Sequence, residues 1–198
     1  MGKKTRRERE EKRESFAAKR TREKRKNLLI ASAVLGLVAV IVGYSAYTFA
    51  TMGASAPGAP PGAGTLGDEH EHASILTRIF GDKFDYSSAA FQIKSSWIHF
   101  EGSDGTTVHR HASGVTLGYL FETLGIGLDD QCYIFPDGRE FCTNEQYSLK
   151  FFINHQPVSD IRNYIIEEGD RILISYGNED TTEIEEQLVE LDSQLIVG

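Results

Sequence analysis

Residues 96–111, SWIHFEGSDGTTVHRH, predict a hairpin around which we expect the fold to be arranged. The sequence GSDG at residues 102–105 separates two runs of β-branched and aromatic residues, which is typical of a tight hairpin. If the loop has three residues and Gly105 is left-handed, His99 lies directly opposite His109. The chemistry of the chain is therefore expected on this hairpin.

Histidine is concentrated on and near the hairpin. His109 and His111 form a His-x-His pair, and strand alternation puts them on the same face as His99 and Glu101. A second His-x-His pair occupies residues 70–72. In a strand such a pair projects both rings to one side, about 6 to 7 Å apart at Cα, and this spacing suits chelation.

We interpret five of the six histidines as a metal site. Imidazole-rich sites favour copper, zinc or nickel, whereas calcium and magnesium prefer oxygen ligands. The alternative is that these histidines are ordinary strand residues, hydrogen-bonded to acids such as Glu71 and Glu101. His155 follows Asn154 and is interpreted as a turn residue. The predicted ligands of copper or zinc are His70, His72, His99, His109 and His111.

Charge is distributed unevenly along the chain. The 198 residues, 40% of them hydrophobic, suffice for one globular domain with accessory segments. Residues 1–26 carry 13 Lys or Arg against five Glu, whereas residues 51–198 carry eight against 24 acids. The basic tail cannot bury a core, so we expect it to be disordered or a frayed, charge-laced helix. We interpret it as a topology signal; contact with anionic lipid or nucleic acid is the alternative.

Residues 27–50 predict a single transmembrane helix. No charge occurs in residues 28–50, and about 20 apolar residues suffice to cross a bilayer. The basic residues 24–26 precede this segment, so the amino terminus is expected in the cytoplasm and the rest outside the cell membrane. A cleaved signal peptide, processed at residues 54–56 (ASA), is the alternative, but its apolar region would be shorter, about 7 to 15 residues.

The rest of the chain predicts a tether and an α+β domain. Residues 51–68, rich in Gly, Ala and Pro, are expected to have nothing to pack and to form an extended tether. Residues 69–178 predict a small mixed sheet with one packed helix, which Thr116 caps and Gly125 ends. The other predicted elements are a hairpin turning at residues 81–82 and final strands within 148–158 and 171–177.

The two cysteines lie at the ends of a predicted hairpin around residues 136–138 (PDG). Thiols outside the membrane tend to oxidise, so Cys132 and Cys142 predict a structural disulfide. A dithiol oxidoreductase would have two residues between its cysteines and one cysteine at a helix start. Here residues 133–141 separate them. A redox-active cross-strand bond is the alternative.

Residues 179–198 predict an acidic amphipathic helix with a capping box from Thr182 to Glu185. Its apolar side is narrow and about two heptads long, which favours docking on its own domain over pairing with a partner. The apolar positions are Ile184, Leu188, Leu191 and Leu195.

Residues 147–177, YSLKFFINHQPVSDIRNYIIEEGDRILISYG, resemble the closing portion of β-grasp domains of the ubiquitin-like and sulfur-carrier kind. In those domains a strand ends in a short turn, an irregular stretch follows, and a strand opened by Gly-Asp completes the sheet. The preceding GVTLGYLFETLGI resembles the single helix of that fold. Because this chain continues into an acidic helix instead of a Gly-Gly tail, the resemblance implies a fold and not carrier chemistry.

The segments HEHASIL, WIHFEG, VHRHASGVTLGYLFETLG and EGDRILISYG are similar to single-span membrane proteins of archaea, particularly ammonia oxidisers, and of some bacteria. Some members are labelled protein disulfide isomerase. This resemblance implies an anchored outer domain and brings no established activity with it.

Three functions follow as hypotheses. The first is a non-catalytic, membrane-anchored module that binds copper or zinc. The second is a thiol-disulfide oxidoreductase or isomerase using Cys132 and Cys142. The third is an accessory subunit whose acidic outer domain binds a membrane-protein partner. The bilayer is an expected partner and nucleic acid is not, and no serine or carboxylate motif predicts another enzyme class.

Overall fold

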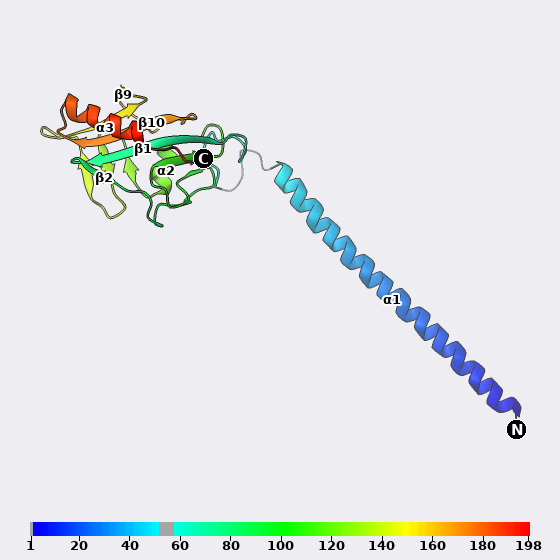
Figure 1. The fold of residues 1–198 in the computed structure, drawn as a ribbon. Helices are drawn as coiled ribbons and strands as arrows, with labels where there is room; N and C mark the ends of the chain where they lie inside the picture. The colour runs from blue at the N-terminus through cyan, green and yellow to red at the C-terminus, as the bar shows by residue number, and fades with distance from the viewer. Residues whose placement is uncertain (1, 52–57) are drawn as a thin grey trace. The chain divides into compact units, whose positions relative to one another are not determined.

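The computed structural model describes residues 2–51 and 58–198, which belong to two separate units (Figure 1). One unit is a long helix and the other is a folded domain that contains every histidine and both cysteines. Residues 52–57, which include the ASA sequence of the signal-peptide alternative, lie outside the described residues.

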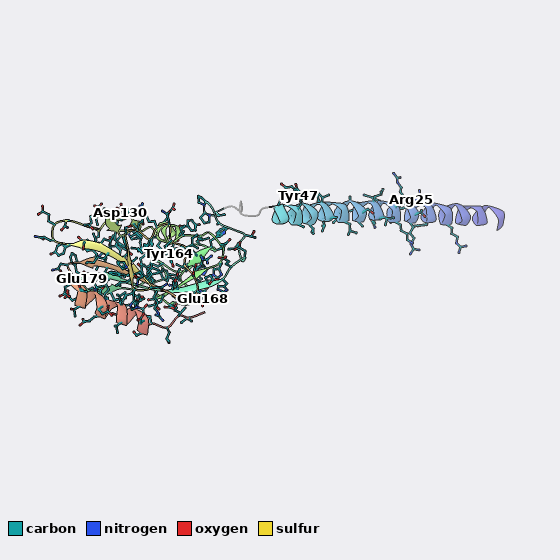
Figure 2. All side chains as sticks on the ribbon, turned by 90° about the horizontal axis from the view of Figure 1, so that it is seen from above. Arg25, Tyr47, Asp130, Tyr164, Glu168 and Glu179 are labelled. Carbon is teal, nitrogen blue, oxygen red and sulfur yellow. A yellow bond between two sulfur atoms is a disulfide. The ribbon has the colours of Figure 1, made fainter. Side chains whose placement is uncertain are left out.

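The first unit is the helix α1 (Gly2–Thr51). The segment contains no proline and many residues with strong helix propensity. The part Lys19–Thr48 is long and apolar enough to span a membrane. Its described side chains project into the surroundings all along the helix, as Arg25 and Tyr47 do in Figure 2. Of the two conformations expected for the basic tail, residues 2–26 have the helical one.

The domain is built on a seven-stranded mixed sheet with the order β3-β4-β1-β10-β8-β9, in which β2 pairs with the free part of β1. A separate three-stranded sheet has the order β5-β6-β7. The strands of the large sheet are β1 (Glu71–Ile79), β2 (Asp82–Phe84), β3 (Ile98–His99), β4 (Thr107–Arg110), β8 (Ser148–Ile153), β9 (Gln156–Val158) and β10 (Asp170–Gly177). Those of the small sheet are β5 (Gly127–Leu128), β6 (Cys132–Ile134) and β7 (Glu140–Cys142).

The sheet is centred on the parallel pair β1 and β10, which joins strands far apart in the sequence. Both strands are covered on both faces, as is usual for parallel strands. The helix α2 (Leu117–Thr123) lies against one face and α3 (Thr181–Ser193) against the other (Figure 1). The predicted α+β class with a mixed sheet is therefore confirmed.

The two faces of β1 belong to two different cores. Ala73 and Ile75 point into the larger core, which includes the buried side of α2. Leu76 points to the other face, where it packs with Leu173 and the apolar side of α3. Strand alternation puts His72 on this second face, the one that α3 covers.

Several predicted local features are confirmed. The first hairpin is present between β1 and β2, and it turns at the left-handed residues Phe80 and Gly81, one residue before the predicted position. The hydroxyl of Thr116 caps α2 by accepting a hydrogen bond from the backbone N–H of Tyr119. Gly125, with φ of 71°, ends the helix. Each of these features depends on residues that are close together in the sequence, so a local pattern is enough to predict it.

The turn of the histidine hairpin differs from the prediction. The left-handed residues between β3 and β4 are Gly102 (φ 64°) and Ser103 (φ 60°), and Gly105 is not among them. Gly105 is instead required by close packing, because a Cβ there would lie 2.4 Å from the backbone nitrogen of Ser87. The loop is longer than three residues, yet the predicted pairing of His99 with His109 is present.

Two other sequence-based expectations were wrong in detail. The segment expected as one strand within residues 148–158 forms the hairpin β8–β9, which turns at the left-handed residues Asn154 and His155. The capping box of α3 is formed by Asp180 and Glu183, because the helix begins before Thr182.

The Gly/Ala/Pro segment also differs from the expectation wherever the structure describes it. Ala63 is buried in the larger core. The backbone N–H of Gly64 donates to the carbonyl oxygen of Ser113 at 2.8 Å. Gly114 lies so close to Gly62 that a Cβ on it would meet the Gly62 carbonyl oxygen at 2.3 Å. Residues 58–67 therefore pack on the domain, because small residues allow the two backbones to approach closely.

The predicted docking of α3 on its own domain is confirmed, although not over its whole predicted length. Ile184, Leu188 and Leu191 are buried against the sheet. Leu195 lies beyond the end of the helix and is 82% exposed.

We expect Leu191→Ala to destabilise the domain by about 2 to 5 kcal/mol, because it removes a buried side chain and leaves a cavity. The matched change Leu195→Ala should stay within about 0.5 kcal/mol of the parent, since that side chain is exposed. Urea unfolding, followed by the fluorescence of the single tryptophan, Trp97, measures both. Equal losses would contradict the packing described for α3.

Candidate metal centre

The register of three neighbouring strands aligns three histidines in one row. His72 of β1 is paired with His109 of β4, and His109 is paired with His99 of β3. Paired residues in a sheet project their side chains to the same face, so the three rings lie side by side. His109 is at the centre of this row.

The remaining two predicted ligands extend the row into a cluster. His70 and His111 each lie two residues from a member of the row, and alternation puts them on the same face. The ring centroids of His70 and His111 are 4.4 Å apart, and those of His99 and His111 are 4.8 Å apart. The ring of His70 is 4.7 Å from that of His72. All five imidazoles thus form one contiguous group, which we call the histidine cluster.

Within the histidine cluster, His70, His72 and His109 form the most compact group. Each offers one ring nitrogen, and these three atoms lie within 4.8 Å of one another. Zinc–nitrogen bonds of about 2.0 to 2.1 Å in a tetrahedron separate ligand atoms by about 3.4 Å. Small side-chain rotations would close this difference, so the three histidines fit a metal ion.

Two ring nitrogens of the cluster are buried without a hydrogen-bond partner among the described residues. They are Nε2 of His72 and Nδ1 of His109. The side chains of these residues are only 13% and 5% exposed. A buried polar atom that lacks a partner costs free energy, and binding a metal ion would remove that cost for each nitrogen.

A distant carboxylate holds His72 in place. Oε2 of Glu168 accepts a hydrogen bond from the backbone N–H of His72 at 2.8 Å and lies 3.1 Å from Nδ1 of its ring. The contact follows from the parallel register, which pairs Ala73 with Asp170 and brings the turn before β10 next to His72. With a proton on Nδ1, the Nε2 lone pair of His72 is free for a metal, an arrangement common among metal-binding histidines.

The neighbouring charges and burial shift several pKa values in the cluster. Burial lowers the pKa of His111 to about 4, with the nearby His99, His70 and His109 acting in the same direction. Burial also lowers the pKa of His109. Contact with the side chain of His99 is the main reason that the pKa of Glu101 is lowered. The lowered pKa values of His109 and His111 favour neutral imidazoles, which are the form that binds metals.

The chain segment after α3 reaches the cluster, which the sequence did not indicate. The backbone N–H of Val197 donates to Oγ1 of Thr107 at 3.2 Å. Gly198 lies against the ring of His72, and a Cβ on Gly198 would come within 2.8 Å of the ring carbon Cε1. This segment therefore covers one side of His72. No short-range pattern could have predicted a contact between the two ends of the domain.

The sixth histidine and the cysteines lie in other parts of the domain. His155 is in the β8–β9 turn, as predicted, and its Nε2 lies 3.0 Å from the carboxylate oxygens of Asp192. Cys132 and Cys142 are paired across β6 and β7 in the small sheet, with their sulfurs 2.06 Å apart, at disulfide distance. Neither sulfur is at the start of a helix, where a thiolate would be stabilised.

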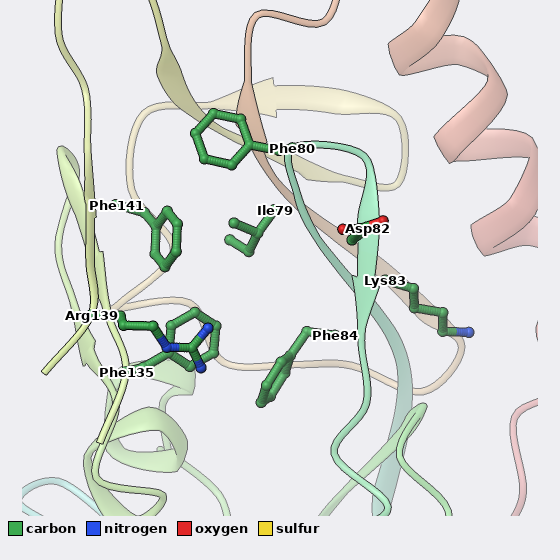
Figure 3. A pocket seen from close by; sticks show the side chains of 8 residues that line it. All are labelled: Ile79, Phe80, Asp82, Lys83, Phe84, Phe135, Arg139 and Phe141. Atoms are coloured by element: carbon green, nitrogen blue, oxygen red, sulfur yellow. The ribbon is translucent and has the colours of Figure 1, made fainter. Parts of the chain in front are cut away.

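A hollow of about 270 Å³ lies between β2 and the small sheet (Figure 3). The rings of Phe80, Phe84 and Phe141 surround it, and the guanidinium of Arg139 lies 4.6 Å from the ring centre of Phe135. The amino group of the neighbouring Lys83 points away from it in Figure 3. The lining is therefore aromatic, and the groups suited to metal chemistry are in the histidine cluster.

Comparison of the chain with family models, with curated proteins and with solved structures gave no match, so the argument for function rests on the geometry.

The low pKa of His111 gives a direct test of the electrostatics. We expect its ring to remain neutral at about pH 5.5 in the metal-free protein, below the ordinary histidine value of about 6.5. Because the folded-state pKa is lowered, the stability that His111 contributes is present above pH 6.5 and is lost as the pH falls towards 4. Nitrogen chemical shifts in a histidine-detected NMR titration report the protonation. A midpoint at or above pH 6.5 would contradict the burial of this ring.

Proposed function

We propose that this chain is a membrane-anchored module that binds copper or zinc through its histidine cluster and performs no catalysis itself. The observation that carries the proposal is the compact group of His70, His72 and His109, whose ligand atoms lie within 4.8 Å of one another. The unpartnered Nε2 of His72 adds to it, since it is a buried nitrogen suited to a metal.

The choice of ion follows from the donor atoms. Imidazole nitrogen suits zinc and copper, while calcium and magnesium would need a mainly oxygen-based site. Both sulfurs are at disulfide distance from each other, so thiolate ligands do not contribute in this state. A group of three imidazoles matches the ligand sets that hold zinc or copper in proteins.

The location of the module is part of the same proposal. The segment Lys19–Thr48 is long and apolar enough to span a membrane, and the basic residues 24–26 lie near its amino-terminal side. Basic residues preferentially stay in the cytoplasm, so the domain would lie outside the cell membrane. Copper and zinc arriving from outside would then meet the histidine cluster first.

We further propose that the domain is β-grasp-like. Strand β8 turns at Asn154 and His155 into the short strand β9, an irregular stretch follows β9, and β10 begins at Asp170 directly after Gly169. This succession matches the β-grasp pattern, and α2 would be its single helix. The resemblance to single-span membrane proteins of archaea also remains a prediction.

The two other functions also remain predictions. The cross-strand position of Cys132 and Cys142 is suited to a structural link, and a reduction potential below about −300 mV would be expected for it. An accessory role requires a membrane-protein partner, which co-purification from native membranes would identify.

Calorimetric titration of the untagged 198-residue chain in detergent tests the proposal. We expect Zn²⁺ or Cu²⁺ to bind with a Kd well below about 1 mM. The double change His72→Ala and His109→Ala should weaken binding by more than about 100-fold, beyond the usual cost of losing an outer-shell partner. His155→Ala is the matched control, because His155 lies in a turn beside Asp192, and it should leave affinity unchanged. Millimolar binding of both ions by the parent would refute the proposal.

Glu168 should act on affinity without contacting the ion. Glu168→Gln weakens the hold on the His72 ring, so we expect Zn²⁺ affinity to fall by about 10- to 100-fold. The adjacent Glu167→Gln makes the same chemical change at an exposed acid and should have no effect. The same titration measures both variants, and equal affinities would show that Glu168 does not orient His72.

A further inference from the structure

The carboxylate of Glu101 lies between two imidazoles of the histidine cluster. Its Oε2 is 3.2 Å from Nε2 of His99, and its Oε1 is 3.7 Å from Nδ1 of His109. Glu101 follows β3 directly and belongs to the loop that leads to β4. Each carboxylate oxygen of Glu101 therefore faces one of the two rings. Glu101 lies on the side of His109 that is nearer to β3.

The backbone fixes which nitrogen of His99 carries a proton. Nδ1 of His99 lies 2.6 Å from the carbonyl oxygen of Ser95, which can only accept a hydrogen bond. Nδ1 must therefore be the N–H donor, and in the neutral ring the lone pair is on Nε2. That lone pair points at the carboxylate of Glu101, whose Oε2 is 3.2 Å away.

Two acceptors facing each other at 3.2 Å need a cation between them. Either a second proton on His99 or a metal ion can meet this need. The distances suit a metal, because ligand atoms around a tetrahedral zinc are separated by about 3.4 Å. Nδ1 of His109, buried and unpartnered, is available as a third ligand atom on the same side.

This arrangement is distinct from the compact group of His70 and His72. His72 is oriented by Glu168 from the β10 side, whereas His99 is oriented by Ser95 from the β3 side. His109 lies between them. Its neutral ring has a single lone pair, so binding an ion on each side requires release of the remaining ring proton to solvent and leaves a bridging imidazolate. The histidine cluster thus has two carboxylates and two separate places for a cation.

We infer that the histidine cluster holds two divalent ions, the second in a subsite formed by Nε2 of His99, the carboxylate of Glu101 and Nδ1 of His109. This inference rests on the proposed metal-binding function and adds a carboxylate, Glu101, that was not among the predicted ligands. The mixed nitrogen and oxygen donor set suits Zn²⁺ or Cu²⁺.

Zinc stoichiometry of the untagged 198-residue chain in detergent, measured by equilibrium dialysis and elemental analysis, tests the inference. We expect two ions in the parent and one in Glu101→Gln. The glutamine amide can donate a hydrogen bond to Nε2 of His99, so this variant removes the ligand while satisfying the ring. Glu71→Gln is the matched control, because alternation puts Glu71 on the opposite face of β1, and it should still bind two.

A second variant provides a control in case the first one misfolds. His72→Ala should lose the ion on the β1 side and keep one at Glu101, and the combination with Glu101→Gln should bind none. Two ions in both the parent and Glu101→Gln, at equal affinity, would overturn the inference. A single ion in the parent, unaffected by Glu101→Gln, would also overturn it and leave the proposed function intact. No ion in the parent would refute both.

Discussion

The register of β3, β4 and β1 determines where the imidazoles lie. A slip of one residue would turn every side chain of a strand to the other face, so the histidine cluster exists only in the observed pairing. Apolar residues on the opposite face maintain that pairing, since Ala73, Ile98 and Val108 are fully buried there. The burial of the larger core and the position of the polar site are thus consequences of the same strand alternation.

The parallel pairing of β1 with β10 determines which residues surround His72. It brings Glu168 next to His72, although 96 positions separate them in the chain. The backbone N–H of Gly169 also donates to the carbonyl oxygen of His72 at 2.8 Å, which fixes the strand end that carries the histidine. On the same face, α3 covers Leu76, and the segment that follows it extends as far as His72. The result is a polar cluster at one end of an apolar interface.

The sequence predicted those parts of the site that depend on short-range patterns. The pairing of His99 with His109 and the shared face of each His-x-His pair follow from alternation within one hairpin. The prediction that Gly105 is the left-handed residue of the turn was wrong. A glycine is required there because the backbone of Ser87 lies too close for a side chain. Glu168 and Gly198 could not be predicted as neighbours of His72, because long-range pairing leaves no periodic signal in one sequence.

The central claim is that these imidazoles bind a metal ion directly. X-ray absorption at the zinc K-edge of the zinc-loaded chain tests it, because imidazole gives outer-shell scattering that water and carboxylate do not. The account predicts Zn–N bonds of about 2.0 to 2.1 Å with scattering from at least two imidazole rings per ion. A first shell of oxygen ligands without imidazole scattering would contradict it.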